Sequence, residues 1–225
     1  MKMQNIGSLA IALLLLSACV SHGDTIFQSS TVGTHIGVTI NSNRIIGVHF
    51  HLDSTVVAHS IGGELVGIDD SGHLSTTYNG GMLFGAIVRL ASPTDVPDSN
   101  FPLDTSDVLV HTLIPVGSPN QDTSASVGSV TLDAGDYALI FGSGQFGGNG
   151  RAFAEGGTEN GTPDYFYSDL GGGYNDGGGI TNIRLFVSGD AAATPLPSPA
   201  LSGMILFGTF GGAVIVKRRR AVLKF

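Results

Sequence analysis

Short runs of β-branched and aromatic residues, separated by glycine, asparagine, aspartate, serine and proline, extend through most of the chain. The clearest run is 44–52, where apolar residues occupy every second position. Alternation with a period of two is typical of a half-buried strand. The residues on its apolar face are Ile46, Val48, Phe50 and Leu52. Since residues 24–193 show no sustained helical periodicity, the sequence predicts an all-β domain.

Further strands are expected at 82–90, 108–116, 127–132, 165–167 and 183–187. Residues 55–68 are expected to form a pair of strands bent at Gly62 and Gly63. Burying so many one-faced strands is simplest in a two-sheet antiparallel β-sandwich. A jelly-roll and a galactose-binding-like topology both remain open.

Residues 130–142 carry the strongest hairpin signal in the chain, with a turn formed by residues 133–136. In the second strand of this hairpin, Tyr137, Leu139 and Phe141 alternate with Ala138 and Ile140. Both of its faces are therefore apolar, which predicts a central strand covered on both sides.

The C-terminal 32 residues predict where the domain is delivered. A proline-rich linker, 191–199, is followed by the uncharged residues 200–216, which as a helix would span roughly 25 Å. The basic tail, 217–225, opens with Lys217, Arg218, Arg219 and Arg220, and positive charge favours the cytoplasmic side. We expect a single transmembrane helix with the preceding domain outside.

This arrangement resembles the PEP-CTERM sorting signal of Gram-negative bacteria, through Pro195, Leu196, Pro197, the apolar span and the arginines of the basic tail. Leu196 stands where the family signature has glutamate. The resemblance implies recognition, and in processed members cleavage, by an exosortase during export to the surface or extracellular matrix. An ordinary, unprocessed membrane anchor is the alternative.

The middle of the chain also resembles an ectodomain found ahead of such tails, in residues 83–88, 135–147, 175–178 and 184–187. That family has no assigned reaction, so the resemblance supports export and leaves the activity open.

At the N-terminus, Lys2 and the apolar residues 9–16 predict a secretory signal peptide, 1–23. Residues 16–19 also read as a lipobox, in which Cys19 would be lipidated and become the new N-terminus. The other interpretation is an ordinary cut after Ser21 or Gly23. The exported domain is then 24–190.

The exported domain is strongly acidic. All 18 acidic residues lie within it against four arginines and no lysine, a net charge of −14. A basic footprint for nucleic acid is lacking. Without cysteine beyond Cys19, the domain has no disulfide or thiolate metal site. The absence of Trp weakens a sugar-binding interpretation. Aromatic side chains that converged near Tyr165, Tyr167 and Tyr174 would favour it.

The histidines and serines are the residues from which a catalytic or metal site could be built. His49 and His51 share one face of a strand, and His35, His59, His73 and His111 lie elsewhere, so an imidazole metal site is conceivable. Ser143 follows a strand, but no helix-forming sequence comes after it, so residues 142–144 are predicted to be a bend instead of a nucleophile elbow.

The glycine-rich loops of 147–179 contain Asp164, Asp169 and Asp176, which are calcium candidates because calcium accepts oxygen ligands in variable geometry. No ordered calcium-binding repeat is present, and ordinary turns explain the same composition. We therefore expect an exported surface or extracellular-matrix protein without a catalytic role, with an exosortase, the membrane and extracellular polysaccharide as partners. The alternatives are a carbohydrate- or calcium-binding surface module and a hydrolase with an unrecognised site.

Overall fold

The computed structural model describes residues 24–68, 81–117 and 121–192, in which all regular structure is β-strand. No helix within these residues is both long and apolar enough to cross a membrane. The expected signal peptide, Cys19, residues 193–199 of the linker, the expected transmembrane helix and the basic tail lie outside them, whereas Ala191 of the linker is the last residue of the final strand. The strands are β1 (Asp24–Gln28), β2 (His35–Ile40), β3 (Arg44–Leu52), β4 (Val56–Gly67), β5 (Met82–Leu90), β6 (Val108–Pro115), β7 (Thr123–Leu132), β8 (Gly135–Gly142), β9 (Ala152–Gly156), β10 (Tyr165–Asp169), β11 (Tyr174–Asp176) and β12 (Leu185–Ala191).

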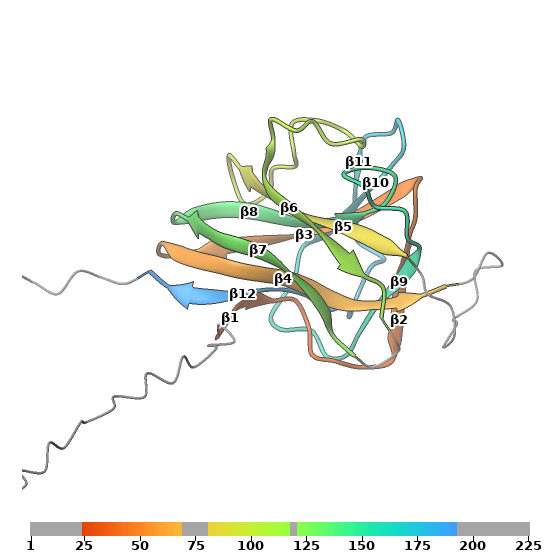
Figure 1. Ribbon diagram of the computed structural model, residues 1–225, viewed down its shortest axis with the longest axis horizontal. Coiled ribbons are helices and arrows are strands. Elements are labelled where there is room, and N and C mark those ends of the chain that lie inside the picture. Colours follow the sequence, from red (N-terminus) through yellow and green to blue (C-terminus); the bar gives the residue numbers. More distant parts are fainter. Residues whose placement is uncertain (1–23, 69–80, 118–120, 193–225) are drawn as a thin grey trace, which may run out of the picture.

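The strands form two antiparallel sheets that face each other (Figure 1). The first sheet has the order β1-β12-β4-β9-β2, with β7 also paired to β4. The second has the order β11-β10-β3-β8-β5-β6. This architecture confirms the prediction of an all-β, antiparallel, sandwich-like domain.

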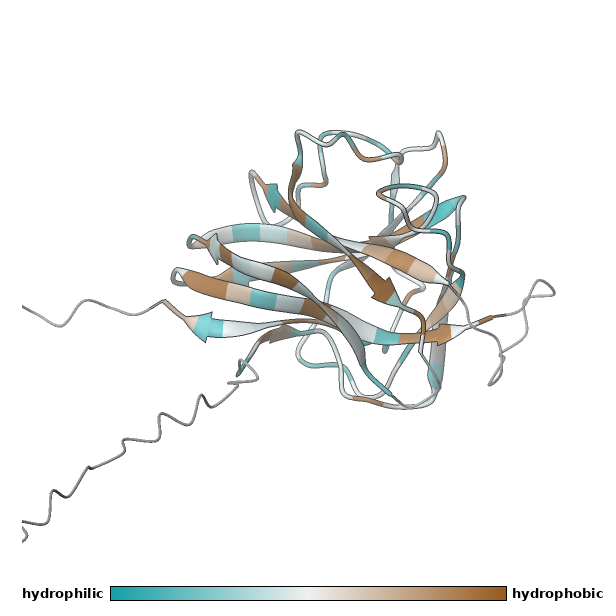
Figure 2. Cartoon of the chain, viewed as in Figure 1, coloured by the Kyte–Doolittle hydropathy of each residue, from teal (hydrophilic) through white to brown (hydrophobic). Residues whose placement is uncertain are grey.

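The main core lies between the sheets and is built from the alternation seen in the sequence (Figure 2). Ile46, Val48, Phe50 and Leu52 of β3 all point into it, as predicted. From the opposite sheet come residues such as Ile61 and Leu185. Burial of these apolar side chains contributes about 25 cal/mol for each Å² removed from water, and it is the main favourable contribution to folding.

A second apolar cluster covers the outer face of the β3-β8-β5 sheet. Residues 91–107, here called the strap, insert Phe101 and Leu103 against Ile140 and its neighbours. Gln145 holds the strap, because the Leu103 N–H donates to its Oε1 at 2.9 Å and its amide donates back to the Leu103 carbonyl. β8 is therefore buried on both faces, which confirms the prediction of a central strand.

Residues 55–68 do not form two strands, so the predicted bend at Gly62 and Gly63 is wrong. β4 runs straight through both glycines. A Cβ on Gly62 would lie 2.2 Å from the Thr123 carbonyl oxygen, and one on Gly63 would lie 2.6 Å from that of Arg184. These glycines permit close approach of neighbouring strands instead of a turn.

The predicted hairpin in 130–142 is also wrong, although its strands and its turn exist. β7 pairs with β4 in the first sheet, whereas β8 pairs with β3 and β5 in the second. The turn, with Gly135 at φ 148°, passes the chain from one sheet to the other. Leu132 and Leu139 both reach the main core, because crossing between the sheets points the inner faces of β7 and β8 toward each other.

Most expected strands are present, with small shifts in their ends. β7 begins four residues before the predicted strand at 127, and β12 begins two residues after the predicted 183. Four short strands were not predicted, and each contains polar residues or glycine: β1, β2, β9 and β11.

Candidate functional site

His49 and His51 lie side by side on the outer face of β3, as their spacing predicts, but each contacts a different carboxylate. The His49 Nδ1–H donates to Asp164 Oδ2 at 2.8 Å, and the His51 Nδ1–H donates to Asp136 Oδ1 at 2.6 Å. Asp53 lies 3.5 Å from the other ring nitrogen of His51. The two rings therefore do not converge on a common ligand.

His49 positions Asp164. Its side chain is only 11% exposed, and its ring packs 4.8 Å from that of Phe166. The Nε2 atom is shut off from solvent and has no hydrogen-bond partner among the described residues. The ring therefore acts through Nδ1, which orients the Asp164 carboxylate.

His51 is exposed, and its charge responds to the carboxylates around it. The hydrogen bond to Asp136 raises the pKa of the His51 ring above its ordinary value, with smaller contributions from the charges of Asp136 and Asp53. Protonated His51 therefore links β3 to β8.

A hollow of about 230 Å³ lies beside His49, between β10, β11 and the start of the strap. We call it the Asp164 hollow. Aromatic, apolar and acidic residues line it together: His49, Thr94, Val96, Asp164, Tyr165, Phe166, Tyr174, Asn175 and Asp176. A concave surface with apolar walls and a few convergent polar groups is the usual form of a small-molecule site.

The structure brings two of the three calcium candidates to this hollow and leaves the third elsewhere. Asp164 and Asp176 line it. Asp169, at the other end of β10, lies roughly 16 Å from Asp164 at the rise of an extended strand. It accepts two hydrogen bonds from the Arg44 guanidinium, at 2.7 and 3.1 Å, and these lower the pKa of Asp169. No described group of three carboxylate or imidazole side chains is placed to hold a metal ion.

The hydroxyl groups of the three tyrosines do not converge, although Tyr165 and Tyr174 both line the Asp164 hollow. The Tyr165 hydroxyl donates to the Ile183 carbonyl at 2.9 Å, inside the domain, where burial raises the pKa of Tyr165 to about 12. Tyr167 lies under the Arg44 guanidinium. The Tyr174 hydroxyl donates to the Ser99 carbonyl in the strap, and burial raises its pKa. A flat aromatic platform for a sugar ring is therefore not formed by these residues.

The remaining histidines are dispersed. His59 lies 3.1 Å from Asp190, His111 stacks on Phe146 at 4.4 Å, and His35 is exposed on β2. His73 falls outside the described residues. Ser143 is buried in a tight loop closed by the Gly144 N–H donating to the Gly148 carbonyl, which agrees with the predicted bend.

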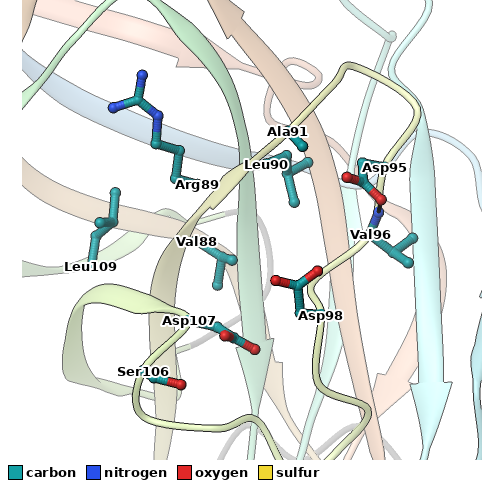
Figure 3. A pocket seen from close by; sticks show the side chains of 10 residues that line it. All are labelled: Val88, Arg89, Leu90, Ala91, Asp95, Val96, Asp98, Ser106, Asp107 and Leu109. Carbon is teal, nitrogen blue, oxygen red and sulfur yellow. Dashed lines mark hydrogen bonds between the residues drawn. The ribbon is translucent and has the colours of Figure 1, made fainter.

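A second hollow of about 230 Å³ lies on the other side of the strap, against β5 and β6 (Figure 3). Three carboxylates face it, from Asp95, Asp98 and Asp107. Asp107 holds the strap, because it accepts hydrogen bonds from the backbone N–H and the hydroxyl of Ser99, at 3.0 and 2.6 Å. Arg89 extends away from these carboxylates in Figure 3 and lies 5.9 Å from the Tyr137 ring.

A buried pair of carboxylates, which the sequence analysis did not single out, occurs in the first sheet. Glu64 on β4 lies directly opposite Glu155 on β9, with 0% and 2% of their surfaces exposed. The Gly33 N–H donates to Glu64 Oε2 at 2.9 Å. Paired carboxylates are the machinery of glycoside hydrolysis. A substrate would reach this pair only after the segments covering it had moved.

Sequence reasoning also missed Thr94 and Val96 as part of the hollow. They precede β10 by some 70 residues, and no local pattern marks them. Only the docking of the strap through Phe101 brings them to β10 and β11.

No protein-family model matches the chain, and no curated protein matches it.

Proposed function

We propose that this protein is an exported component of the cell surface or extracellular matrix without a catalytic role, carried outward by residues 1–23 and anchored, or processed by an exosortase, through residues 191–225. In this proposal it passes through the inner membrane before reaching the surface. Its partners are the exosortase, the membrane and extracellular polysaccharide.

The observation that carries the proposal is the position of the two ends of the folded domain. Asp24 begins β1 and lies opposite Gly189 of β12, which ends at Ala191 (Figure 1). The folded domain therefore begins and ends on two neighbouring strands, at the same end of the β1–β12 pair. A tether attached there interrupts no strand, so the domain can be displayed before and after the tail is cut.

The charge of the domain supports display outside the cell as well. A net charge of −14 keeps an isolated domain soluble and disfavours nucleic acid. Within this proposal the finer topology is jelly-roll or galactose-binding-like. Jelly rolls are a common scaffold of lectin domains, whose ligand sites lie on connecting loops.

A ligand-binding surface module is the second candidate, and the Asp164 hollow favours it. A hydrolase is a weaker candidate, because the only buried carboxylate pair among the described residues, Glu64 and Glu155, is closed to substrate. Neither His49 nor His51 is paired with a serine among these residues.

Intact mass of the protein from cell and medium fractions tests the proposal. We expect a cut after Ser21 or Gly23, or a cut before Cys19 with a lipid attached to that residue, and a second species cut near Pro195–Pro197. A variant with neutral residues in place of Lys217 and Arg218–Arg220 should be retained less in the inner membrane. An intact N-terminus, or unchanged retention and orientation of this variant, would contradict the proposal.

A further inference from the structure

We propose that the Asp164 hollow binds a small organic ligand through a primary ammonium group, and that its natural ligand is an amino-sugar unit of a cationic polysaccharide. This site goes beyond the export proposed above, because binding by the purified protein does not depend on where the protein is displayed.

The polar groups free to meet a ligand in this hollow are almost all acceptors. Asp176 is exposed and makes no hydrogen bond or ion pair with another described residue. Asp164 Oδ2 accepts a hydrogen bond from His49, so Asp164 Oδ1 remains available to a ligand. A complementary ligand must therefore supply donors.

The charge of the hollow selects a cation among donor-bearing ligands. Two carboxylates line it, whereas Arg44, the arginine that pairs with β10, is engaged by Asp169 outside it. In the β10–β11 ladder, Asp176 lies opposite Phe166. Because Asp164 comes two residues before Phe166, Asp164 and Asp176 are diagonal neighbours. Diagonal neighbours of this kind are about 7–8 Å apart, so one ammonium group can lie between the two carboxylates. Hydrogen bonds from an ammonium to carboxylates are among the stronger ones in proteins.

The apolar lining distinguishes an organic ammonium from a bare metal ion. The rings of Phe166 and Tyr174 meet edge to face at 5.3 Å, and Val96 also lines the hollow. These side chains supply none of the six to eight oxygens that calcium requires. They do suit the carbon skeleton of a ligand, and an ammonium near an aromatic face gains a cation–π contribution.

The size of the hollow and one exposed hydroxyl point to a single sugar ring. About 230 Å³ is smaller than the roughly 300–1,000 Å³ of sites for drug-sized ligands. Thr94, an exposed residue of the lining, can offer its hydroxyl to the hydroxyls of a sugar. A 2-amino sugar carries ammonium, hydroxyl donors and a compact carbon ring together.

The test is titration of the full chain in detergent with glucosamine, followed by NMR or calorimetry, with N-acetylglucosamine as the uncharged match. We expect saturable binding of glucosamine and binding at least about tenfold weaker for the acetylated sugar, since a charged hydrogen bond is lost. Asp176→Asn should weaken glucosamine binding by a similar factor. Asp53→Asn, which removes the same charge from a fully exposed side chain outside the hollow, should leave it unchanged.

Circular dichroism confirms that both variants are folded before they are compared. Equal affinity for the two sugars, no saturable binding of either, or an Asp176→Asn protein that binds glucosamine like the parent would each overturn the proposal. So would a calcium titration that saturates the hollow while glucosamine does not.

Discussion

The Tyr137 hydroxyl donates a hydrogen bond to the Asp133 carbonyl oxygen at 2.7 Å, across the turn that carries the chain from one sheet to the other. Tyr137 is fully buried and belongs to the main core, so this bond ties the turn to the space between the sheets. Asp133 thus lies where the chain passes from β7 in one sheet to β8 in the other.

Replacing Tyr137 with Phe should lower the free energy of unfolding by about 0.5–1.5 kcal/mol, because the ring still fills the core while the hydrogen bond is lost. Chemical denaturation of parent and variant measures the change. Equal midpoints at equal slope would show that the bond contributes nothing to holding the turn.

Truncating Leu139 to Ala should cost about 2–5 kcal/mol, since this fully buried side chain lies in the middle of the central strand and its loss leaves a cavity. Leu170→Ala is the matched control, because Leu170 is 55% exposed and should change stability by no more than about 0.5 kcal/mol. Similar losses of stability in the two variants would mean that Leu139 does not lie in the core.

The stability contributed by His51 should depend on pH. Its pKa is raised above 6.5 in the folded protein by the hydrogen bond to Asp136, so its contribution is fully present below the unfolded value and is lost as pH rises through the folded pKa. The melting temperature of a His51→Gln variant should therefore fall below that of the parent at about pH 5, and the difference should shrink toward about pH 9. A difference that is constant or grows with pH would contradict this.

Removing calcium should leave the melting temperature of the protein unchanged, because Asp169 is held by Arg44 far from Asp164 and Asp176. A ligand bound only to the folded state would stabilise it by mass action. Thermal melts with millimolar calcium and with a chelator make the comparison. A lower melting temperature in chelator would show that these loops bind calcium.

Arg44→Gln is the variant that checks this assignment of Asp169. In the parent, the pKa of Asp169 is lower in the folded protein than in the unfolded chain. The ion pair with Arg44 therefore stabilises the fold at pH values above the unfolded pKa, and this stabilisation is lost as pH falls through the folded pKa. Both side chains are partly exposed, so we expect a loss of no more than about 1 kcal/mol at neutral pH, and less at acid pH. A loss that grows toward acid pH would show that Asp169 is not stabilised by Arg44.

Local alternation in the sequence determined the strands that bury one or both faces. Residues 44–52 and 82–90 are strands with the predicted ends, because side chains on a strand alternate between faces whatever the strand pairs with. β2 and β9 were missed, since glycine and polar residues break that alternation in short edge or connecting strands.

Only the tertiary structure decided which strands pair and which residues come together at the surface. Nothing local distinguishes a turn that joins paired strands from one that crosses between sheets, so the course of the chain after Leu132 depends on the core that both sheets share. The Asp164 hollow likewise exists because Phe101 buries itself against the outer face of one sheet and carries Thr94 with it. Such contacts between residues distant in the sequence follow from packing, which a pattern read along one chain does not encode.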